Sequence, residues 1–481
     1  MDEATRALWH QRPAGSILHP SARGARMGPM LDYARIDGYL DAHLDQSIGE
    51  LSRLVAQPSV GAQNRGMAEC AALVREMLAK RGFTAEVLAT DGAPVVYAER
   101  AGRSGKTLLF YNHYDVQPAE PLELWDSPPF EPALRDGKLY GRGVSDDKGH
   151  LVARLFALDA ILATAGELPC RVKFVVEGEE ETSSRHLHEF VLREKGRLQA
   201  DACVWEFGYL DHTGAPLQYL GLRGICYVEL SVTTAKMDAH SGVGGSIFPN
   251  AAWRLAWALG TLKGPDERIR IPGFYDAVRA PSARDREFMA ALPELAEEFK
   301  RRYGVERFLK GLTGGVELRI AEVFEPTCTI CGLTAGYQGP GPKTVLPARA
   351  SAKVDFRLVP DQKPEDVLRL LRAHLDAEGF RDVEMEFLGG EPPGRTDPDH
   401  PFVKLVVDAA EPVYGRKMTV VPMTGGSGPV HMFIHDLGLP VVTAGLGYPD
   451  TRAHAPNENI VLEHYVRHAK HVARILGEFA R

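Results

Sequence analysis

Residues 106–115 read Lys106-Thr107-Leu108-Leu109-Phe110-Tyr111-Asn112-His113-Tyr114-Asp115. The apolar part, 107–111, has the length and the flanks of a β-strand. Residues two apart on a strand point the same way, so His113 and Asp115 can act together. The carboxylate would then fix the tautomer of the imidazole and raise its basicity as a metal ligand. The alternative is an ordinary histidine at a strand end beside an aspartate in a turn.

The segments around this strand alternate between strand and helix. Strands are predicted at 85–88, 95–98 and 171–176, and helices at 31–59, 67–81 and 151–164, the last of them amphipathic. Strands separated by helices of this length indicate an α/β sheet with active groups at the strand ends.

A second pattern begins near Gly221. Cleanly alternating strands are expected at 227–233, 350–358 and 383–387, with helices at about 248–263 and 364–378. From about residue 391 the first pattern returns, with strands at 419–421 and 441–444. We therefore predict a domain made of 30–222 and 391–481, with an α+β domain, 223–390, inserted into it. Residues 1–29 lack the apolar stretch of a signal peptide and are expected to be a flexible leader.

Two further segments carry carboxylates. The glycine-rich turn Gly141–Gly149 opens a helix and contains Asp146 and Asp147, where carboxylates suit the helix dipole. An N-cap role would explain one aspartate but not the surrounding glycines. The predicted strand 171–176 leads into an acidic run of Glu177, Glu179, Glu180 and Glu181.

The adjacent carboxylates of this run repel one another unless a cation or a proton intervenes. A metal ligand beside a general base of raised pKa is one solution. A solvated acidic turn is the alternative, and the apolar strand that delivers the acids argues against it. Glu206 follows another apolar strand, 202–205, and His454 lies in a loop; each is weak evidence alone. Two imidazoles with several carboxylates from across one domain favour a pair of divalent metal ions.

Composition excludes several classes of partner. The 481 residues include 64 acidic and 56 basic ones, a net charge of −8, which makes nucleic acid and anionic membranes poor partners. No apolar run approaches the roughly 20 residues of a membrane helix. The six cysteines are too scattered for a disulfide framework, so a reducing, cytoplasmic location fits best.

Three other spacings compete as metal sites. Cys328 and Cys331 have zinc or redox spacing, but no second pair or nearby histidine completes a site. The histidine pairs lack the His-Glu-x-x-His pattern of helical zinc proteases, so surface or packed histidines are the better interpretation. They are His431 with His435, and His186 with His188.

Taken in order, the segments from about residue 35 onward resemble the dinuclear-metal exopeptidases. That family includes carnosinases and cytosolic non-specific dipeptidase, carboxypeptidase G, aminoacylase and succinyl-diaminopimelate desuccinylase. The segments 221–226 and 239–242 look closest to the dipeptidase branch. The resemblance implies a three-layer, mixed-sheet α/β hydrolase domain and an inserted two-layer, ferredoxin-like lid that forms a homodimer.

The resemblance also implies a role for each segment. His113 and Glu206 would bind one metal ion, Glu181 and His454 the other, and Asp146, followed by a cis peptide bond, would bridge both. Asp115 would orient His113, and Glu180 would be the general base. In the inserted domain, His240 would reach the partner subunit's active site and stabilise the oxyanion. Thr344, Arg357 and Ser427 would hold the substrate's carboxylate.

The expected activity is hydrolysis of dipeptides or short peptides with a free C-terminal carboxylate, by a metal-bridged water with Glu180 as base. Zinc suits the mixed histidine and carboxylate ligands best, and manganese or cobalt also fit. One alternative is a deacylase or desuccinylase of an N-acyl amino acid, which shares the metals and differs in the side-chain pocket. The other is a non-catalytic metal-binding or scaffold protein, against which the presence of base and ligands argues.

Overall fold

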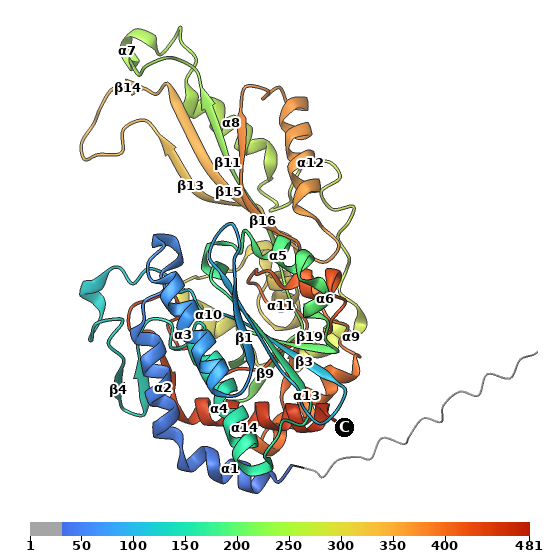
Figure 1. Cartoon of the computed structure of the whole chain (residues 1–481). Coiled ribbons are helices and arrows are strands. Elements are labelled where there is room, and N and C mark those ends of the chain that lie inside the picture. Colours follow the sequence, from blue (N-terminus) through green and yellow to red (C-terminus); the bar gives the residue numbers. More distant parts are fainter. Residues whose placement is uncertain (1–30) are drawn as a thin grey trace, which may run out of the picture.

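The computed structural model describes residues 31–481, and Figure 1 shows a larger lower body joined to a smaller upper one. The expected leader, 1–29, lies outside the described residues. Within residues 31–481, no helix combines the length and the apolar character that crossing a membrane requires.

A six-stranded mixed sheet forms the centre of the lower body, in the order β1-β2-β6-β3-β7-β19. Its strands are β1 (Thr84–Leu88), β2 (Val95–Arg100), β3 (Thr107–His113), β6 (Arg171–Glu177), β7 (Ala202–Trp205) and β19 (Val441–Thr443). The four strands from β6 to β19 run parallel, whereas β1 and β2 pair antiparallel. The chain therefore brings the carboxyl ends of β3, β6 and β7 to one edge.

Both faces of this sheet are covered, which gives three layers. In β3, Leu108 and Phe110 join the apolar core on one face, and Leu109 and Tyr111 join the core on the other, as strand alternation requires. Six helices cover the first face: α1 (Tyr33–Ala42), α2 (Leu44–Ala56), α3 (Met67–Lys80), α4 (Lys148–Ala165), α13 (Pro401–Tyr414) and α14 (Leu462–Phe479). The second face carries α5 (Leu187–Arg193), α6 (Lys195–Leu198) and the π-helical turn η6 (Met432–Asp436).

Two helices differ from the sequence expectation. The predicted helix 31–59 is broken at His43, whose backbone is not helical and whose ring stacks on Tyr39 with centroids 3.9 Å apart. The predicted amphipathic helix 151–164 is α4, which is buried on nearly every side. It lies between the sheet and the helices α1, α2 and α14, so both of its faces contact protein.

The upper body is a four-stranded antiparallel sheet in the order β13-β15-β11-β16. Alternate residues of β11 face α8 and α12, which cover one side of the sheet and give the two-layer form expected of the inserted domain. The far end carries the short antiparallel pair β12-β14 and the helical turn α7 (Figure 1). The elements are β11 (Gly224–Thr233), β12 (Ala239–His240), α7 (Ser241–Gly244), α8 (Ala251–Leu262), β13 (Thr329–Ala335), β14 (Val345–Leu346), β15 (Arg349–Leu358), α12 (Pro364–Ala377) and β16 (Glu384–Glu391).

Three helices between α8 and β13 return to the lower body (Figure 1). They are α9 (Ala283–Ala290), α10 (Ala296–Tyr303) and α11 (Gly315–Phe324). Met289 of α9 and Val323 of α11 form an apolar cluster with Met423, next to a small sheet of β8 (Tyr209–Leu210), β9 (Pro216–Tyr219) and β18 (Thr419–Val421).

Two further small sheets complete the structure. One contains β4 (Ala133–Arg135), β5 (Lys138–Tyr140) and β20 (Asn459–Val461), and the other pairs β10 (Gly221–Leu222) with β17 (Gly394–Arg395). The division of the chain into 30–222 with 391–481, and 223–390, stays a prediction.

Candidate metal centre

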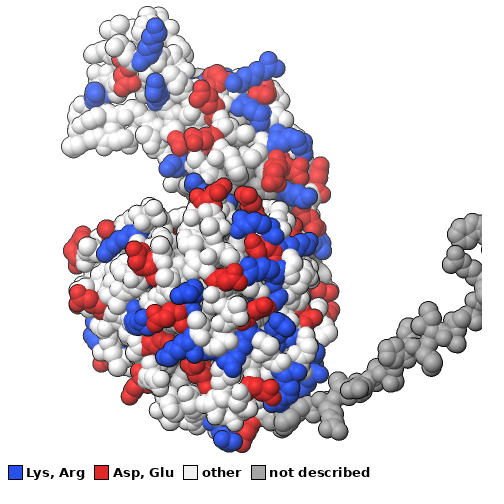
Figure 2. Space-filling model, viewed as in Figure 1, with Lys and Arg blue, Asp and Glu red and all other residues white. Residues whose placement is uncertain are grey.

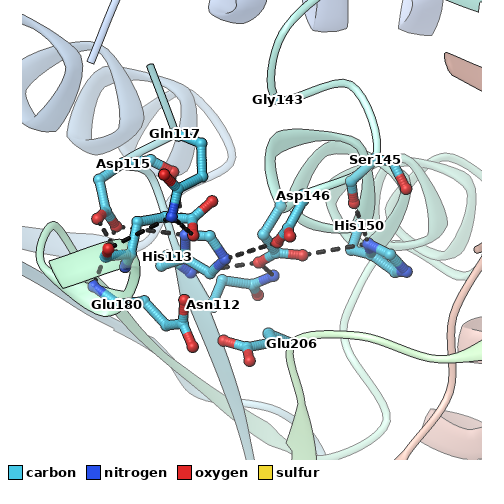
Figure 3. Close-up of polar contacts among 12 residues, drawn as sticks. Asn112, His113, Asp115, Gln117, Gly143, Ser145, Asp146, His150, Glu180 and Glu206 are labelled. Atoms are coloured by element: carbon cyan, nitrogen blue, oxygen red, sulfur yellow. Dashed lines mark hydrogen bonds and ion pairs between the residues drawn. The ribbon is translucent and has the colours of Figure 1, made fainter. Parts of the chain in front are cut away.

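Polar side chains from separate segments meet at the carboxyl edge of the central sheet (Figure 3). His113 ends β3, Glu180 and Glu181 follow β6, and Glu206 follows β7. Parallel strands present their carboxyl ends at the same edge, which is where open α/β sheets place their sites. The sheet thus brings together residues that are up to 93 positions apart in the sequence, the separation of His113 and Glu206.

Asp146 lies between the two histidines. Its Oδ1 is 3.0 Å from Nε2 of His113, and its Oδ2 is 3.1 Å from Nε2 of His454. His454 Nε2 is also 3.1 Å from Oε2 of Glu181, so Asp146, Glu181 and His454 offer three converging donor atoms. One carboxylate that contacts both imidazoles through different oxygens has the arrangement expected of a bridging ligand.

Asp115 contacts both His113 and the acidic turn after β6. Nδ1 of His113 is 3.0 Å from the Asp115 carbonyl oxygen and 3.3 Å from its Oδ1. The same carboxylate accepts hydrogen bonds from the backbone N–H groups of Glu180, at 3.2 Å, and Glu181, at 3.0 Å. Asp115 therefore leaves Nε2 of His113 directed at Asp146 and holds the turn that carries the two glutamates.

Glu206 is buried and Glu180 is partly buried, and both direct their carboxylates into the same space (Figure 3). Burial raises the pKa of Glu180 well above its usual value; Glu181 and Asp146 raise it further, and His113 opposes them. Burial and the nearby Glu180 do the same to the pKa of Glu206, whose Oε2 has no hydrogen-bond partner among the described residues.

The crowded carboxylates of the centre favour the binding of cations. Hydrogen bonds to Asp146 and Glu181 raise the pKa of His454 to about 10, so without metal this imidazole holds a proton. Crowded, buried carboxylates can ionise together only if a positive charge lies among them. Nitrogen and oxygen donors of this kind are ligands of divalent metals, so these residues fit a metal site.

Asp147 does not cap the helix that it precedes. It occupies the N-cap position of α4, but its side chain makes no capping hydrogen bond. Instead its Oδ2 accepts from Nδ2 of Asn112, at 2.6 Å, and from the backbone N–H of His113, at 3.2 Å. The peptide bond between Asp146 and Asp147 is cis, as the resemblance implies. The two aspartates thus differ: Asp146 faces the centre and Asp147 fastens the loop to β3.

Glu458 is a residue that the sequence interpretation missed. It is fully buried and accepts hydrogen bonds from the backbone N–H groups of Gly143, at 3.0 Å, Ser145, at 2.9 Å, and Asp146, at 3.0 Å. It also accepts from Nη1 of Arg142 at 2.7 Å. In the sequence, Glu458 is notable only because it lies four residues after His454. That position gives no indication that Glu458 holds a loop more than 300 positions away.

Removing the Glu458 carboxylate should destabilise the protein strongly. In Glu458→Ala, Arg142 loses its buried partner, which costs about 3–5 kcal/mol of unfolding free energy. The matched control is Glu463→Ala, which breaks an exposed ion pair with Arg467 and should cost no more than about 1 kcal/mol. Denaturant unfolding of both metal-free variants measures the difference; equal midpoints would contradict the role given to Glu458.

Arg154 is a second residue that the sequence did not reveal. This buried side chain on α4 donates to the carbonyl of Tyr111 at 2.8 Å and to Oδ1 of Asn112 at 2.7 Å, both near the end of β3. It also donates to the carbonyl of Glu206 at 3.0 Å. It therefore joins the ends of β3 and β7, the strands that deliver His113 and Glu206.

Of the remaining predicted site residues, two lie at the border of this cluster and two lie far from it. Arg357 of β15 donates from Nη1 to Oγ of Ser427 at 2.7 Å, at the junction of the two bodies. A Cβ atom added to Gly428, the next residue, would lie 3.5 Å from Oε1 of Glu180, so this pair borders the centre. His240 and Thr344 lie together, 3.4 Å apart, at the far end of the upper body, and the structure does not bring them to the cluster.

The competing spacings do not form metal sites among residues 31–481, where Asp146, Glu181 and His454 are the one clustered group of three. His186 contacts Glu179 at 2.8 Å, His188 contacts Asp436, and His431 contacts Glu391. Cys328 is buried and Cys331 is exposed, and both are free thiols. The interpretation of these residues as packed or surface groups stays a prediction.

Imidazoles and carboxylates at the carboxyl edge of the central mixed sheet, beside a two-layer α+β body, fit a metal-dependent hydrolase. The chain belongs to peptidase family M20/M25/M40, whose model matches residues 109–478. The resemblance stated from the motifs is thereby confirmed.

Characterised relatives match the chain almost from end to end. Beta-Ala-His dipeptidase of Rattus norvegicus is 29% identical over 469 residues, which cover 92% of this chain and 94% of the relative. The Cys-Gly metallodipeptidase dug1 of Schizosaccharomyces pombe is 28% identical over 466 residues, 92% and 97% of the two chains. The crystal structure of an M20 family metallo-carboxypeptidase, Sso-CP2 from Sulfolobus solfataricus, superposes with a TM-score of 0.86 at 37% identity. It covers 90% of this chain and 99% of that one.

Proposed function

We propose that this protein hydrolyses the amide bond of dipeptides or short peptides that have a free C-terminal carboxylate, with two divalent metal ions. The observation that carries the proposal is Asp146 between His113 and His454, beside the partly buried carboxylate of Glu180. The similarity to two dipeptidases and a metallo-carboxypeptidase supports it. A cytoplasmic location remains a prediction.

Each ion would take one histidine, one terminal carboxylate and a share of Asp146. His113 and Glu206 would serve the first ion, and His454 and Glu181 the second. Bound there, the ions would polarise the scissile carbonyl and lower the pKa of a water molecule. The donor set suits zinc, and manganese or cobalt are the alternatives.

The protein's own groups would move the proton and hold the ligands in place. Glu180 makes no close contact with either histidine, so its carboxylate is free to accept a proton from water and pass it to the leaving amine. Asp115 keeps Nε2 of His113 directed at Asp146. Gln117 donates to Oε2 of Glu181 at 2.8 Å, which fixes that carboxylate toward His454.

Arg357 and Ser427 would bind the substrate's C-terminal carboxylate. Arginine pairs both oxygens of a carboxylate, and the Arg357–Ser427 contact at 2.7 Å already presents a cation and a hydroxyl side by side. Gly428, which follows Ser427, lies close to the carboxylate of Glu180. The substrate's C-terminal carboxylate would therefore be held a short distance from the scissile bond. That distance would restrict the enzyme to the C-terminal bond.

A substrate panel tests this function. The metal-loaded enzyme should cleave a dipeptide much faster than its C-terminal amide. Arg357→Lys should raise KM for the dipeptide by about 10- to 100-fold, which is about 1.4–2.8 kcal/mol. The matched control is Arg369→Lys, whose guanidinium is exposed and pairs with Asp366. Cleavage of N-acyl amino acids without cleavage of any dipeptide would make the enzyme a deacylase or desuccinylase instead.

We further propose that His240, with Thr344, completes the centre of a partner subunit in a homodimer formed through residues 223–390. His240 is exposed and lies far from the centre of its own chain (Figure 1). The end of the upper body around it exposes Met237, Val243 and Ile247, each at least 67% accessible, and is largely uncharged on the face seen in Figure 2.

His240→Ala should lower kcat by roughly 10²–10³-fold, the usual effect of losing one oxyanion donor, without dissociating the dimer. Activity and sedimentation are measured on the same preparation. Mixing the variant with a Glu180→Gln chain should restore part of the activity, because one of the two centres in a mixed dimer would then be complete. Unchanged turnover in a stable dimer would contradict the role in trans.

A further inference from the structure

A large cavity lies in the lower body, away from the residues proposed to hold the carboxylate. It has a volume of about 590 Å³ and lies between the small sheet β8-β9-β18 on one side and α9, α10 and α11 on the other. Leu292, Phe299 and Val323 line the helical wall, and Tyr209, Tyr219 and Met423 line the opposite wall. This volume lies within the roughly 300–1,000 Å³ range of small-molecule sites.

The cavity is connected to the metal centre through two segments. Phe207 directly follows Glu206, and its ring packs against Tyr209 and Tyr219 with centroids 5.8 and 5.7 Å apart. Ala453 and Ala455, on either side of His454, also line the cavity. Burial, with the negative charges of Asp146 and Glu206 close by, raises the pKa of Tyr209, so this wall lies within electrostatic reach of both carboxylates.

The lining of the cavity indicates what it would hold. Aliphatic and aromatic side chains form most of it, and its charged residues include the ion pairs Arg302–Glu298 and Arg452–Asp450. The hydroxyls of Tyr209 and Tyr219 have no hydrogen-bond partner among residues 31–481. Aromatic walls favour a flat apolar group, which gains edge-to-face contacts of about 0.5–1.5 kcal/mol each.

We propose that this cavity binds an aromatic side chain of the substrate's amino-terminal residue, the residue that supplies the acyl group of the scissile bond. The inference rests on the proposed function. Arg357 and Ser427 lie at the junction with the upper body, whereas the cavity lies in the lower body between β18 and α11. A peptide held by its carboxylate at that junction and cleaved at Glu180 extends its amino-terminal residue toward the cavity.

Leu292 is the residue with which to fill the cavity, because it lies partly exposed on the wall, in the loop after α9. The dipeptides Phe-Gly, Ala-Gly and Gly-Phe are the probes, and kcat/KM is measured for wild type, Leu292→Trp and Leu292→Ala. Leu309→Trp, at an exposed leucine outside the cavity, is the matched control. We expect wild type to prefer Phe-Gly over Ala-Gly, and Leu292→Trp to lower that ratio by about tenfold or more.

The outcomes separate this proposal from the function on which it rests. If folded Leu292→Trp had the wild-type ratio of kcat/KM for Phe-Gly to kcat/KM for Ala-Gly, the cavity assignment would be overturned. A loss of kcat/KM for Gly-Phe instead would also overturn it. Neither result would affect the proposal of dipeptide hydrolysis. Calorimetric binding of Phe-Gly to the metal-free variants does not depend on turnover. Binding weakened about tenfold by Leu292→Trp, but not by Leu309→Trp, supports the cavity even if no dipeptide is cleaved; equal affinities contradict it.

Discussion

Replacing Glu180 with glutamine should lower kcat for dipeptide hydrolysis by roughly 10²–10⁴-fold, the usual contribution of a general base, while the metal ions stay bound. Glutamine keeps the size of the side chain but cannot accept a proton. Glu180 makes no close contact with the histidines of the centre, so its loss should not displace a metal. Steady-state kinetics and metal analysis on the same preparation measure both effects.

Glu179→Gln is the matched control for this change. Glu179 adjoins Glu180 in the same acidic turn, but its carboxylate contacts His186 at 2.8 Å and not the centre. We expect kcat of this control to stay close to that of wild type. Near-native turnover of Glu180→Gln would remove Glu180 from the role of base, and loss of metal from that variant would make it a ligand instead.

Replacing Asp146 with asparagine should remove both metal ions at once. Its two oxygens contact different histidines, at 3.0 and 3.1 Å, so both sites depend on one carboxylate. In wild type, each ion present at 100 times its Kd raises the unfolding free energy by about 2.7 kcal/mol. Asp146→Asn should bind metal with less than about a hundredth of the wild-type affinity. It should therefore show little of this stabilisation and no measurable turnover.

The control for this change is Asp91→Asn, at an exposed aspartate outside the centre. Its metal content, its stabilisation by metal and its kcat should match wild type. If Asp146→Asn retained one ion per chain with its affinity intact, Asp146 would serve a single site, and the bridging arrangement would be wrong.

Most of the fold could be predicted because strand alternation is local information. The expected strands 107–111 and 171–176 are the cores of β3 and β6, and the expected strands 227–233 and 350–358 are the cores of β11 and β15. The break at His43 was missed because no glycine or proline marks it; His43 leaves the helical conformation while its backbone N–H and its ring Nδ1 both contact the Tyr39 carbonyl. The return of α9 to α11 to the lower body depends on contacts with Met423, more than 90 positions away from α11, which no local pattern shows.

The candidate centre was predicted as a set of residues, and the geometry brings His113, Asp146, Glu181 and His454 together. The supporting residues could not be predicted. Glu458 acts through backbone N–H groups of a distant loop, and Arg154 acts through carbonyl groups, so neither leaves a motif in the sequence. The roles of Glu180, Arg357 and His240 remain predictions that the variants above test.

The central claim is that two metal ions, held by His113, Asp146, Glu181, Glu206 and His454, are required for dipeptide hydrolysis. The most direct test strips the protein of metal and measures dipeptidase activity while zinc or manganese is added back in known equivalents. The account predicts no activity in the metal-free protein and a plateau at two equivalents per chain. Activity that survives metal removal, or a plateau at one equivalent, would contradict it.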